Sequence, residues 1–168
     1  RWSLVDTGMP AAACATTWER LLPPRRLGRI VLTHFHPDHM GLAGWLQAGH
    51  GDGAVCMSRL TFESWQRMVG VTPPHLRQRY AQYLQAHGLA GATEALEKFM
   101  AIGRANEFAR TPRVDRWLSD GDRIELGGHQ WQCIEVHGHA DGHLCLYCPQ
   151  TGVLIAGGKS RRMGRDKR

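Results

Sequence analysis

A short apolar strand that runs directly into a cluster of polar side chains is the feature that most constrains how this chain can fold. The run RIVLT over residues 29–33 is rich in β-branched residues, which is typical of a buried strand. The polar segment from His34 to His39 follows at once, and a helical pattern containing Leu42 and Leu46 comes next. The stretch 54–57 then predicts another strand. This order predicts a right-handed βαβ unit, a partly parallel sheet and an α/β fold.

The rest of the chain divides into three parts. Residues 2–6 predict a strand, and residues 17–22 predict a helix that the prolines at 23 and 24 end. Residues 58–113 have helical periodicity and predict a helical insertion. After it, short strands with turn signals between them predict an antiparallel meander. We expect those strands at residues 116–118, 123–126, 130–136, 144–148 and 153–156.

Two apolar stripes in the helical insertion are predicted to be packing faces rather than parts of a cofactor site. The first stripe contains Leu76, Tyr80, Tyr83, Leu84 and His87. The second contains Ala92, Leu96, Phe99, Met100 and Gly103. Glu94 and Lys98 are spaced to form an ion pair on one helical turn.

Four side chains that can bind a metal ion lie within six residues, namely His34, His36, Asp38 and His39. In an extended segment, residues two apart face the same side, so His34 and His36 can converge on one ion. Pro37 ends that segment, and we expect Asp38 and His39 to point back across the same cleft. Imidazole and carboxylate groups are ligands that zinc prefers. The carboxyl end of a buried strand is also where α/β sheets place their sites.

These residues carry a resemblance to a known family. The segment THFHPDHMG at 33–41 resembles the His-x-His-x-Asp-His signature of the metallo-β-lactamase-fold hydrolases, particularly the glyoxalase II-like members. The segment LVDTG at 4–8 is similar to the family's strand and turn before that loop. The segment VHGHADGH at 136–143 is similar to the family's Gly-His-x-x-Gly-His element. The resemblance implies an α/β metallo-β-lactamase-like αββα sandwich over residues 1–157, with the insertion at 58–113.

The resemblance also implies roles for individual residues. It implies a first metal held by His34, His36 and His139, and a second held by Asp38 and His39, with Asp38 also expected to be catalytic. Asp6 is expected to orient a ligand histidine, and His143 to support the site without binding metal. His137 replaces a residue that is usually proline, and we expect no ligand role for it. The histidines without a partner in the sequence are predicted to lie on the surface, namely His50, His75, His87 and His129.

The activity implied by the resemblance is zinc-dependent hydrolysis of a small molecule. A zinc ion lowers the pKa of its bound water to about 7, so that a metal-bound hydroxide can attack an activated carbonyl. Thioesters, lactones and β-lactams are all substrates of the family. We expect the insertion at 58–113 to wall the cleft and select among them.

The family pattern breaks after residue 157. The family has Gly-Asp where this chain has Gly157 and Gly158, so the carboxylate that bridges two metals is missing and the second site is expected to be compromised. The second half of the sandwich is also expected to be incomplete. Of the net charge of +6, the last ten residues contribute six basic side chains and one acidic side chain, or +5.

That basic tail has two interpretations. It is either an authentic extension that binds nucleic acid or anionic surfaces, or an out-of-frame product of a truncated gene. The abrupt end of the family pattern favours the second, so residues 158–168 are expected to be non-native or disordered. The absence of an initiator Met also favours a chain truncated at both ends, with impaired activity.

Other functions are alternatives to the hydrolase. The first is a catalytically inactive metal-binding protein, and the second is a mononuclear iron enzyme like the persulfide dioxygenases, whose site needs the missing Asp. A nuclease is disfavoured because residues 1–158 have 15 basic and 14 acidic side chains, a net charge of +1, and lack a basic stripe for phosphate. We therefore expect no nucleic-acid partner.

The composition of the chain bears on membrane association, on its compartment and on the state of its cysteines. No apolar run approaches the roughly 18–20 residues that span a bilayer, so no membrane association is expected. An odd number of cysteines predicts reduced thiols in a cytoplasmic protein rather than a disulfide scaffold. Cys145 and Cys148 have zinc-knuckle spacing, but no second pair accompanies them, and we do not expect them to bind metal.

Overall fold

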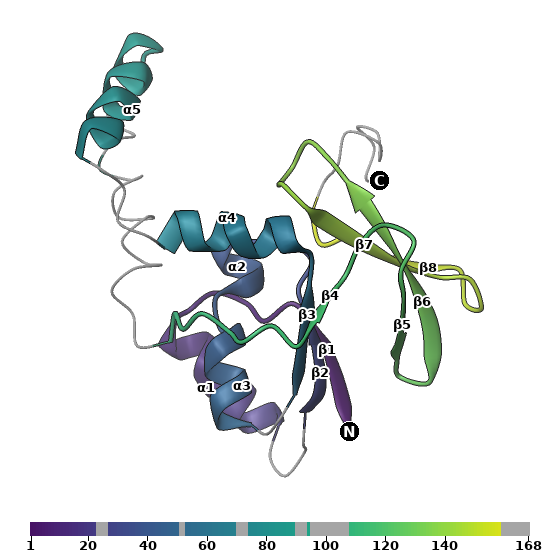
Figure 1. The fold of residues 1–168 in the computed structure, drawn as a ribbon. Coiled ribbons are helices and arrows are strands. Elements are labelled where there is room, and N and C mark those ends of the chain that lie inside the picture. The colour runs from purple at the N-terminus through teal and green to yellow at the C-terminus, as the bar shows by residue number, and fades with distance from the viewer. Residues whose placement is uncertain (23–26, 51–52, 70–73, 90–93, 95–107, 159–168) are drawn as a thin grey trace.

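The computed structural model describes residues 1–22, 27–50, 53–69, 74–89, 94 and 108–158. Within these ranges the chain forms two four-stranded sheets and five helices (Figure 1). None of the described helices is long and apolar enough to cross a membrane.

The first sheet is parallel and contains the predicted βαβ unit. Its strands lie in the order β1 (Trp2–Val5), β2 (Leu27–Val31), β3 (Ala54–Met57) and β4 (Arg116–Trp117). All three neighbouring pairs are parallel, with Leu4 opposite Ile30 and Ile30 opposite Val55. The prediction of a partly parallel sheet is therefore confirmed.

The second sheet is an antiparallel meander, as predicted for the strands after residue 122, but the prediction for residues 116–118 is wrong, because β4 pairs in parallel with β3 and belongs to the first sheet. It contains β5 (Arg123–Leu126), β6 (His129–Val136), β7 (His143–Cys148) and β8 (Val153–Ile155) in chain order. Each neighbouring pair is antiparallel. The strand ends differ from the predicted ones by at most one residue in this sheet.

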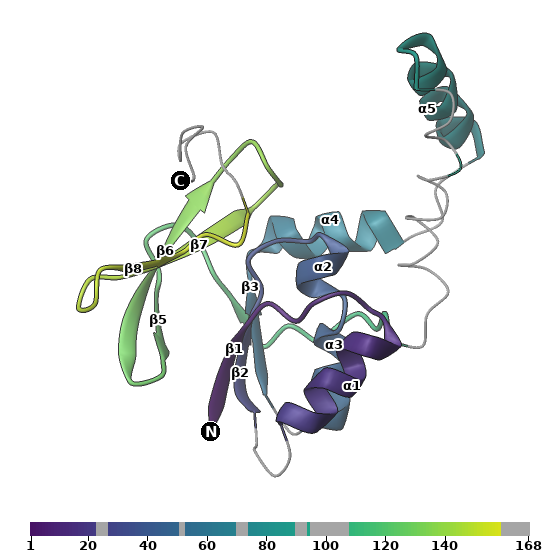
Figure 2. The same cartoon turned by 180° about the vertical axis from the view of Figure 1, so that it is seen from behind.

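Helices cover one face of the parallel sheet, and the second sheet covers the other (Figures 1 and 2). The covering helices are α1 (Ala12–Leu21), α2 (Pro37–Met40), α3 (Ala43–Gly49) and α4 (Arg59–Val69). Alternate side chains of β2 enter the two resulting cores, since Ile30 packs among the helices whereas Val31 packs between the sheets. Among the described residues no helix covers the outer face of the second sheet, which agrees with a partial sandwich.

Helix α5 (Pro74–Ala86) stands away from both sheets (Figure 1). The predicted packing stripe on it is only partly correct, because Leu84 is buried but Tyr80 and Tyr83 are 48 % and 56 % exposed. Their rings stack on each other at 6.3 Å, since α5 offers them no core to enter. The second predicted stripe and Lys98 lie outside the described residues.

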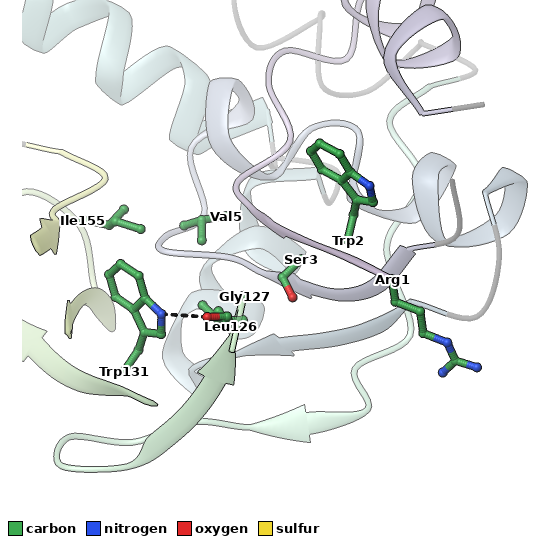
Figure 3. Close-up of a pocket in the computed structure, with 8 residues that line it drawn as sticks. All are labelled: Arg1, Trp2, Ser3, Val5, Leu126, Gly127, Trp131 and Ile155. Carbon is green, nitrogen blue, oxygen red and sulfur yellow. Dashed lines mark hydrogen bonds between the residues drawn. The ribbon is translucent and has the colours of Figure 1, made fainter. Parts of the chain in front are cut away.

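A pocket of about 350 Å³ opens between the two sheets at the edge strand β1 (Figure 3). Trp131 lines it and donates a hydrogen bond from Nε1 to the carbonyl of Leu126 at 3.1 Å. None of the predicted ligand histidines lines this pocket. The candidate site therefore lies elsewhere.

Candidate metal centre

Three imidazole rings converge at the carboxyl end of the parallel sheet. His34 Nε2 lies 3.1 Å from His36 Nδ1 and 3.1 Å from His139 Nε2. One nitrogen from each ring lies within 4.8 Å of the others, close enough for one ion. Among the described residues, these three form the group suited to hold a metal.

The fold explains why residues so far apart in sequence meet here. His34 and His36 follow β2, and Pro37 at the first position of α2 then turns the chain. His139 lies in the turn between β6 and β7. The two sheets are joined at this point, because the Leu144 amide donates to the Thr33 carbonyl at 2.9 Å.

The electrostatics of the site favour neutral rings at His34 and His36. Burial, together with the neighbouring histidines, lowers the pKa of His34 from its ordinary 6.5 to about 2. Burial and His139 also lower the pKa of His36. A neutral imidazole is the form that binds a metal, so the donor set fits a cation such as zinc.

Asp6 connects β1 to this site. It has a positive φ of 61°, and its carboxylate accepts hydrogen bonds from the Thr33 amide and the Thr33 hydroxyl, both at 2.8 Å. His39 Nδ1 lies 2.7 Å from Asp6 Oδ2. That hydrogen bond raises the pKa of His39, against the opposing effect of burial. Asp6 thus orients His39 directly and contacts His34 only through Thr33.

The two residues predicted for a second metal lie beside the trio but are not part of it. The rings of His34 and His39 have centroids 4.0 Å apart. The Asp38 side chain is 59 % exposed, and its Oδ2 lies 3.4 Å from His39 Nε2. The described residues that could hold one ion together do not include Asp38 or His39.

The remaining histidine predictions can be compared with the structure in the same way. His143 is buried, and its Nε2 donates to the Ala156 carbonyl at 2.6 Å, while its Nδ1 has no partner among the described residues. The side chain of His137 is 75 % exposed and lies 3.8 Å from Glu135. His75, His87 and His129 are exposed, whereas His50 is half-buried against Trp45. Cys145 and Cys148 are buried free thiols.

Gly158 lies directly against the trio. A Cβ atom at this position would lie 2.6 Å from Cδ2 and 2.7 Å from Nε2 of His139. The position where the resembled family has an acidic residue is therefore adjacent to a candidate ligand nitrogen. In this chain that position provides no side-chain donor.

Three hydroxyl residues near the site are not predicted from the sequence. The sequence pattern places Thr33 only in the strand. Ser58 and Thr61, at the start of α4, both donate to the Gly142 carbonyl, at 2.7 Å and 3.0 Å, and so hold the loop that carries His139. The Ser58 hydroxyl also accepts from the Thr61 amide, an N-cap pattern that the sequence signals by a serine before a helix.

Comparisons with known proteins agree with this geometry. Residues 1–157 match the family model described as the metallo-beta-lactamase superfamily. The hydroxyacylglutathione hydrolase of Rhizobium meliloti (strain 1021) is 40 % identical over 55 residues, which are 33 % of this chain and 22 % of that protein. The hydroxyacylglutathione hydrolase of Cereibacter sphaeroides (strain ATCC 17029 / ATH 2.4.9) is 29 % identical over 92 residues, 54 % of this chain and 36 % of that protein.

Solved structures resemble the chain over most of its length. A beta-lactamase domain protein from Burkholderia ambifaria is 26 % identical with a TM-score of 0.71, and the match covers 91 % of this chain and 44 % of that one. A metallo-beta-lactamase family protein from Thermus thermophilus is 28 % identical with a TM-score of 0.64, covering 90 % and 48 %. The chain therefore spans less than half the length of these two proteins.

Proposed function

Because this chain belongs to the metallo-β-lactamase superfamily, we propose that it is a metal-dependent hydrolase whose metal centre is built from His34, His36 and His139. The observation that carries the proposal is the convergence of three imidazole nitrogens within 4.8 Å, two from the loop after β2 and one from the opposite sheet. We propose residues 1–157 as the domain that carries this activity.

The chain's own residues supply binding and orientation. His34 and His36 offer neutral nitrogens because burial lowers the pKa of both rings. His139 is the exposed member of the trio, and we propose that a substrate approaches from its side. A zinc ion held there would supply Lewis acidity and a water molecule of lowered pKa. Three imidazole donors with one open position are a common zinc arrangement in enzymes.

The proposed substrate class is a small molecule with an activated carbonyl, with a thioester first. Two relatives that match this chain are named hydroxyacylglutathione hydrolases, and their names describe thioester cleavage. β-Lactams follow, since a solved relative is named a beta-lactamase domain protein, and lactones are proposed as a third class of activated carbonyl. We propose that α4, whose first residues hold the loop that carries His139, borders the substrate.

We propose that a second metal binds more weakly than the first. His39 packs against His34, and Asp38 lies 3.4 Å from His39, but Gly158, beside His139, supplies no carboxylate. Asp38 remains our candidate for a residue that contacts substrate or a second ion, because its side chain is 59 % exposed beside the trio.

The test combines metal titration with turnover. We expect one tightly bound zinc per chain by calorimetry, and zinc-dependent hydrolysis of a hydroxyacylglutathione thioester that exceeds hydrolysis of a lactone or a β-lactam. His139→Ala should abolish both zinc binding and hydrolysis, whereas His137→Ala, two residues away and exposed, should retain both. Equal loss in the two variants would refute the proposed ligand set.

A catalytically inactive metal-binding protein is the second candidate, favoured by Gly158. It predicts that the chain binds one zinc through the same trio and hydrolyses none of the three substrate classes. The same experiment separates the two functions, because the metal titration then succeeds while turnover stays at the level of His139→Ala.

A further inference from the structure

The hydroxyl of Thr33 lies between an acidic side chain and a ring of the trio. Thr33 is fully buried, and its Oγ1 lies 2.8 Å from Asp6 Oδ2 and 2.9 Å from His34 Nδ1. A hydroxyl has one proton and two lone pairs. It can therefore donate to only one of these two neighbours and must accept from the other.

The surroundings of Asp6 decide the direction. Asp6 Oδ1 accepts from the Thr33 amide at 2.8 Å, and Asp6 Oδ2 lies 2.7 Å from His39 Nδ1. An ionised carboxylate has no proton to give, so every partner of Asp6 must be a donor. The Thr33 hydroxyl therefore donates to Asp6. It is left with lone pairs for His34, whose Nδ1 must carry the proton.

We propose that Thr33 is a positioning residue that fixes the proton of His34 on Nδ1. The Nε2 atom, which faces His36 and His139, then keeps its lone pair available to bind a metal. The Nε2 atom is the one that lies 3.1 Å from a nitrogen of each of those rings. The assignment of the proton rests on these hydrogen bonds to the Asp6 carboxylate and does not depend on a bound metal. Only its consequence for metal binding rests on the proposed function.

The Thr33 side chain is held in this orientation by its neighbours. Its carbonyl accepts from the Leu144 amide at 2.9 Å. Gly157 packs directly against it, and a Cβ atom at Gly157 would overlap the Thr33 hydroxyl and lie 2.7 Å from the Thr33 Cβ. The φ of Gly157 is +63°, which also favours glycine. Thr33 is therefore fixed from β7 and from the end of β8.

The experiment compares the wild-type chain with two substitutions at Thr33 and one control. Thr33→Ser retains the hydroxyl, whereas Thr33→Val has nearly the same shape without it. Thr7→Val is the matched control, because Thr7 is also buried and its hydroxyl also makes two hydrogen bonds, to the His39 carbonyl and from the Leu42 amide, but neither involves a ring. The position of the proton on each histidine ring is read from nitrogen NMR spectra of the metal-free chain. Zinc affinity is then measured for the same four proteins.

We expect the His34 proton on Nδ1 in the wild type, Thr33→Ser and Thr7→Val, and a population with the proton on Nε2 in Thr33→Val. Zinc affinity should fall about 10- to 100-fold in Thr33→Val, as is usual when an outer partner of a ligand is lost, and less than threefold in the other two. A wild-type spectrum with the proton on Nε2 overturns the proposal, even if Thr33→Val does not fold. If the wild-type chain has the His34 proton on Nδ1 but binds no zinc, the proposed function is refuted and the role of Thr33 in placing the proton still holds.

Discussion

A histidine ring offers a metal the nitrogen that carries no proton, so the partner of the opposite nitrogen decides what each ring can do. His39 has its Nδ1 against Asp6, which directs Nε2 outward. His143 is bonded the other way round, because its Nε2 donates to the Ala156 carbonyl. Its Nδ1 is fully buried and has no hydrogen-bond partner among the residues that the structure describes. This contrast between His39 and His143 explains why His143, although it belongs to the motif at 136–143, lies outside the trio.

Substitution of Gly158 should act on the trio through His139. In Gly158→Ala the new Cβ would lie 2.6 Å from the His139 ring, so the ring must shift, and zinc affinity should fall about 10-fold or more, as when an outer partner is lost. Gly158→Asp should partly compensate by adding a carboxylate next to the ion and allowing a second zinc to bind. Calorimetric titration measures both effects.

The control for this prediction is Gly49→Ala, because a Cβ at Gly49 would have no atom within 4 Å. Its zinc affinity should match the wild type. An unchanged affinity in Gly158→Ala would mean that His139 is not a ligand or that its ring moves freely.

The metal-free chain should lose stability as the pH falls below about 6.5. The pKa of His34 is lowered from 6.5 to about 2, so the unfolded chain takes up a proton in this range and the folded chain does not. The free energy of unfolding then decreases by at most about 1.4 kcal/mol per pH unit from this residue. His39 works in the opposite direction, because its raised pKa contributes stability that is present below pH 6.5 and is lost as the pH rises through the folded value.

Urea unfolding in EDTA at several pH values between 5 and 7.5 measures this dependence. His34→Gln should have the smaller slope, since glutamine does not titrate. A wild-type stability that is flat over this range, or equal slopes in the two chains, would contradict the shifted pKa of His34.

At the scale of elements, the strands were more predictable than the helices. The strands at 54–57 and 123–126 have the predicted bounds, because alternating or β-branched residues define them. Helix α1 begins at Ala12, five residues before the prediction, because an alanine-rich start has high helix propensity but no apolar periodicity to reveal it. On α5, periodicity predicted a packed face, but the exposed Tyr80 and Tyr83 show that periodicity does not supply a partner.

The site was predictable only in part. Its ligand candidates follow from a motif whose residues are close in sequence, together with a second motif near His139. The hydrogen bonds that hold them join residues far apart, such as Ser58 and Gly142, which are 84 positions apart. Such contacts depend on how the two sheets pack, and no local pattern encodes that packing.

The hydrogen bonds from Ser58 and Thr61 to the Gly142 carbonyl form a clamp between the start of α4 and the β6–β7 loop. This clamp gives a prediction at the scale of elements. Gly142 has a φ of +67°, and a Cβ there would lie 2.6 Å from the Cβ of Leu60 and overlap the Ser58 hydroxyl. Gly142→Ala should therefore lower the free energy of unfolding by about 1–2 kcal/mol for the backbone and about 1–3 kcal/mol more for overpacking. Zinc affinity should fall as well, because the loop carries His139.

Gly152→Ala is the matched control. Gly152 has a similar φ of +72°, but a Cβ there would meet nothing within 4 Å. Only the backbone cost should appear, with no change in zinc affinity. Equal unfolding curves for the two variants would show that the clamp contributes nothing.

At the scale of the whole molecule, the packing of two sheets against each other positions the site. A core of small and branched side chains lies between them, including Val31, Leu144 and Leu146. Arginine side chains add hydrogen bonds across the gap, from Arg29 to the Glu125 carbonyl and from Arg116 to the Arg123 carbonyl at 3.0 Å. Since His34 follows one sheet and His139 the other, the distance between these rings depends on this core.

Truncation of that core should therefore affect both stability and metal binding. Leu146 is fully buried, and Leu146→Ala should lower the free energy of unfolding by about 2–5 kcal/mol. Leu154→Ala, on the neighbouring strand, removes the same atoms from a side chain that is 45 % exposed, and should cost less than about 1 kcal/mol. Chemical unfolding monitored by tryptophan fluorescence compares them, and similar losses would argue against a core between the sheets.

The nitrogens of His34 and His139 that meet at 3.1 Å belong to residues 105 positions apart. An ion bound to both would act as a cross-link, and a cross-link that closes a loop of about 100 residues removes about 4–5 kcal/mol of chain entropy from the unfolded ensemble. Binding to the folded state alone also raises stability with metal concentration. The supply of metal would then set how much of the protein survives proteolysis in the cell, before any substrate is met.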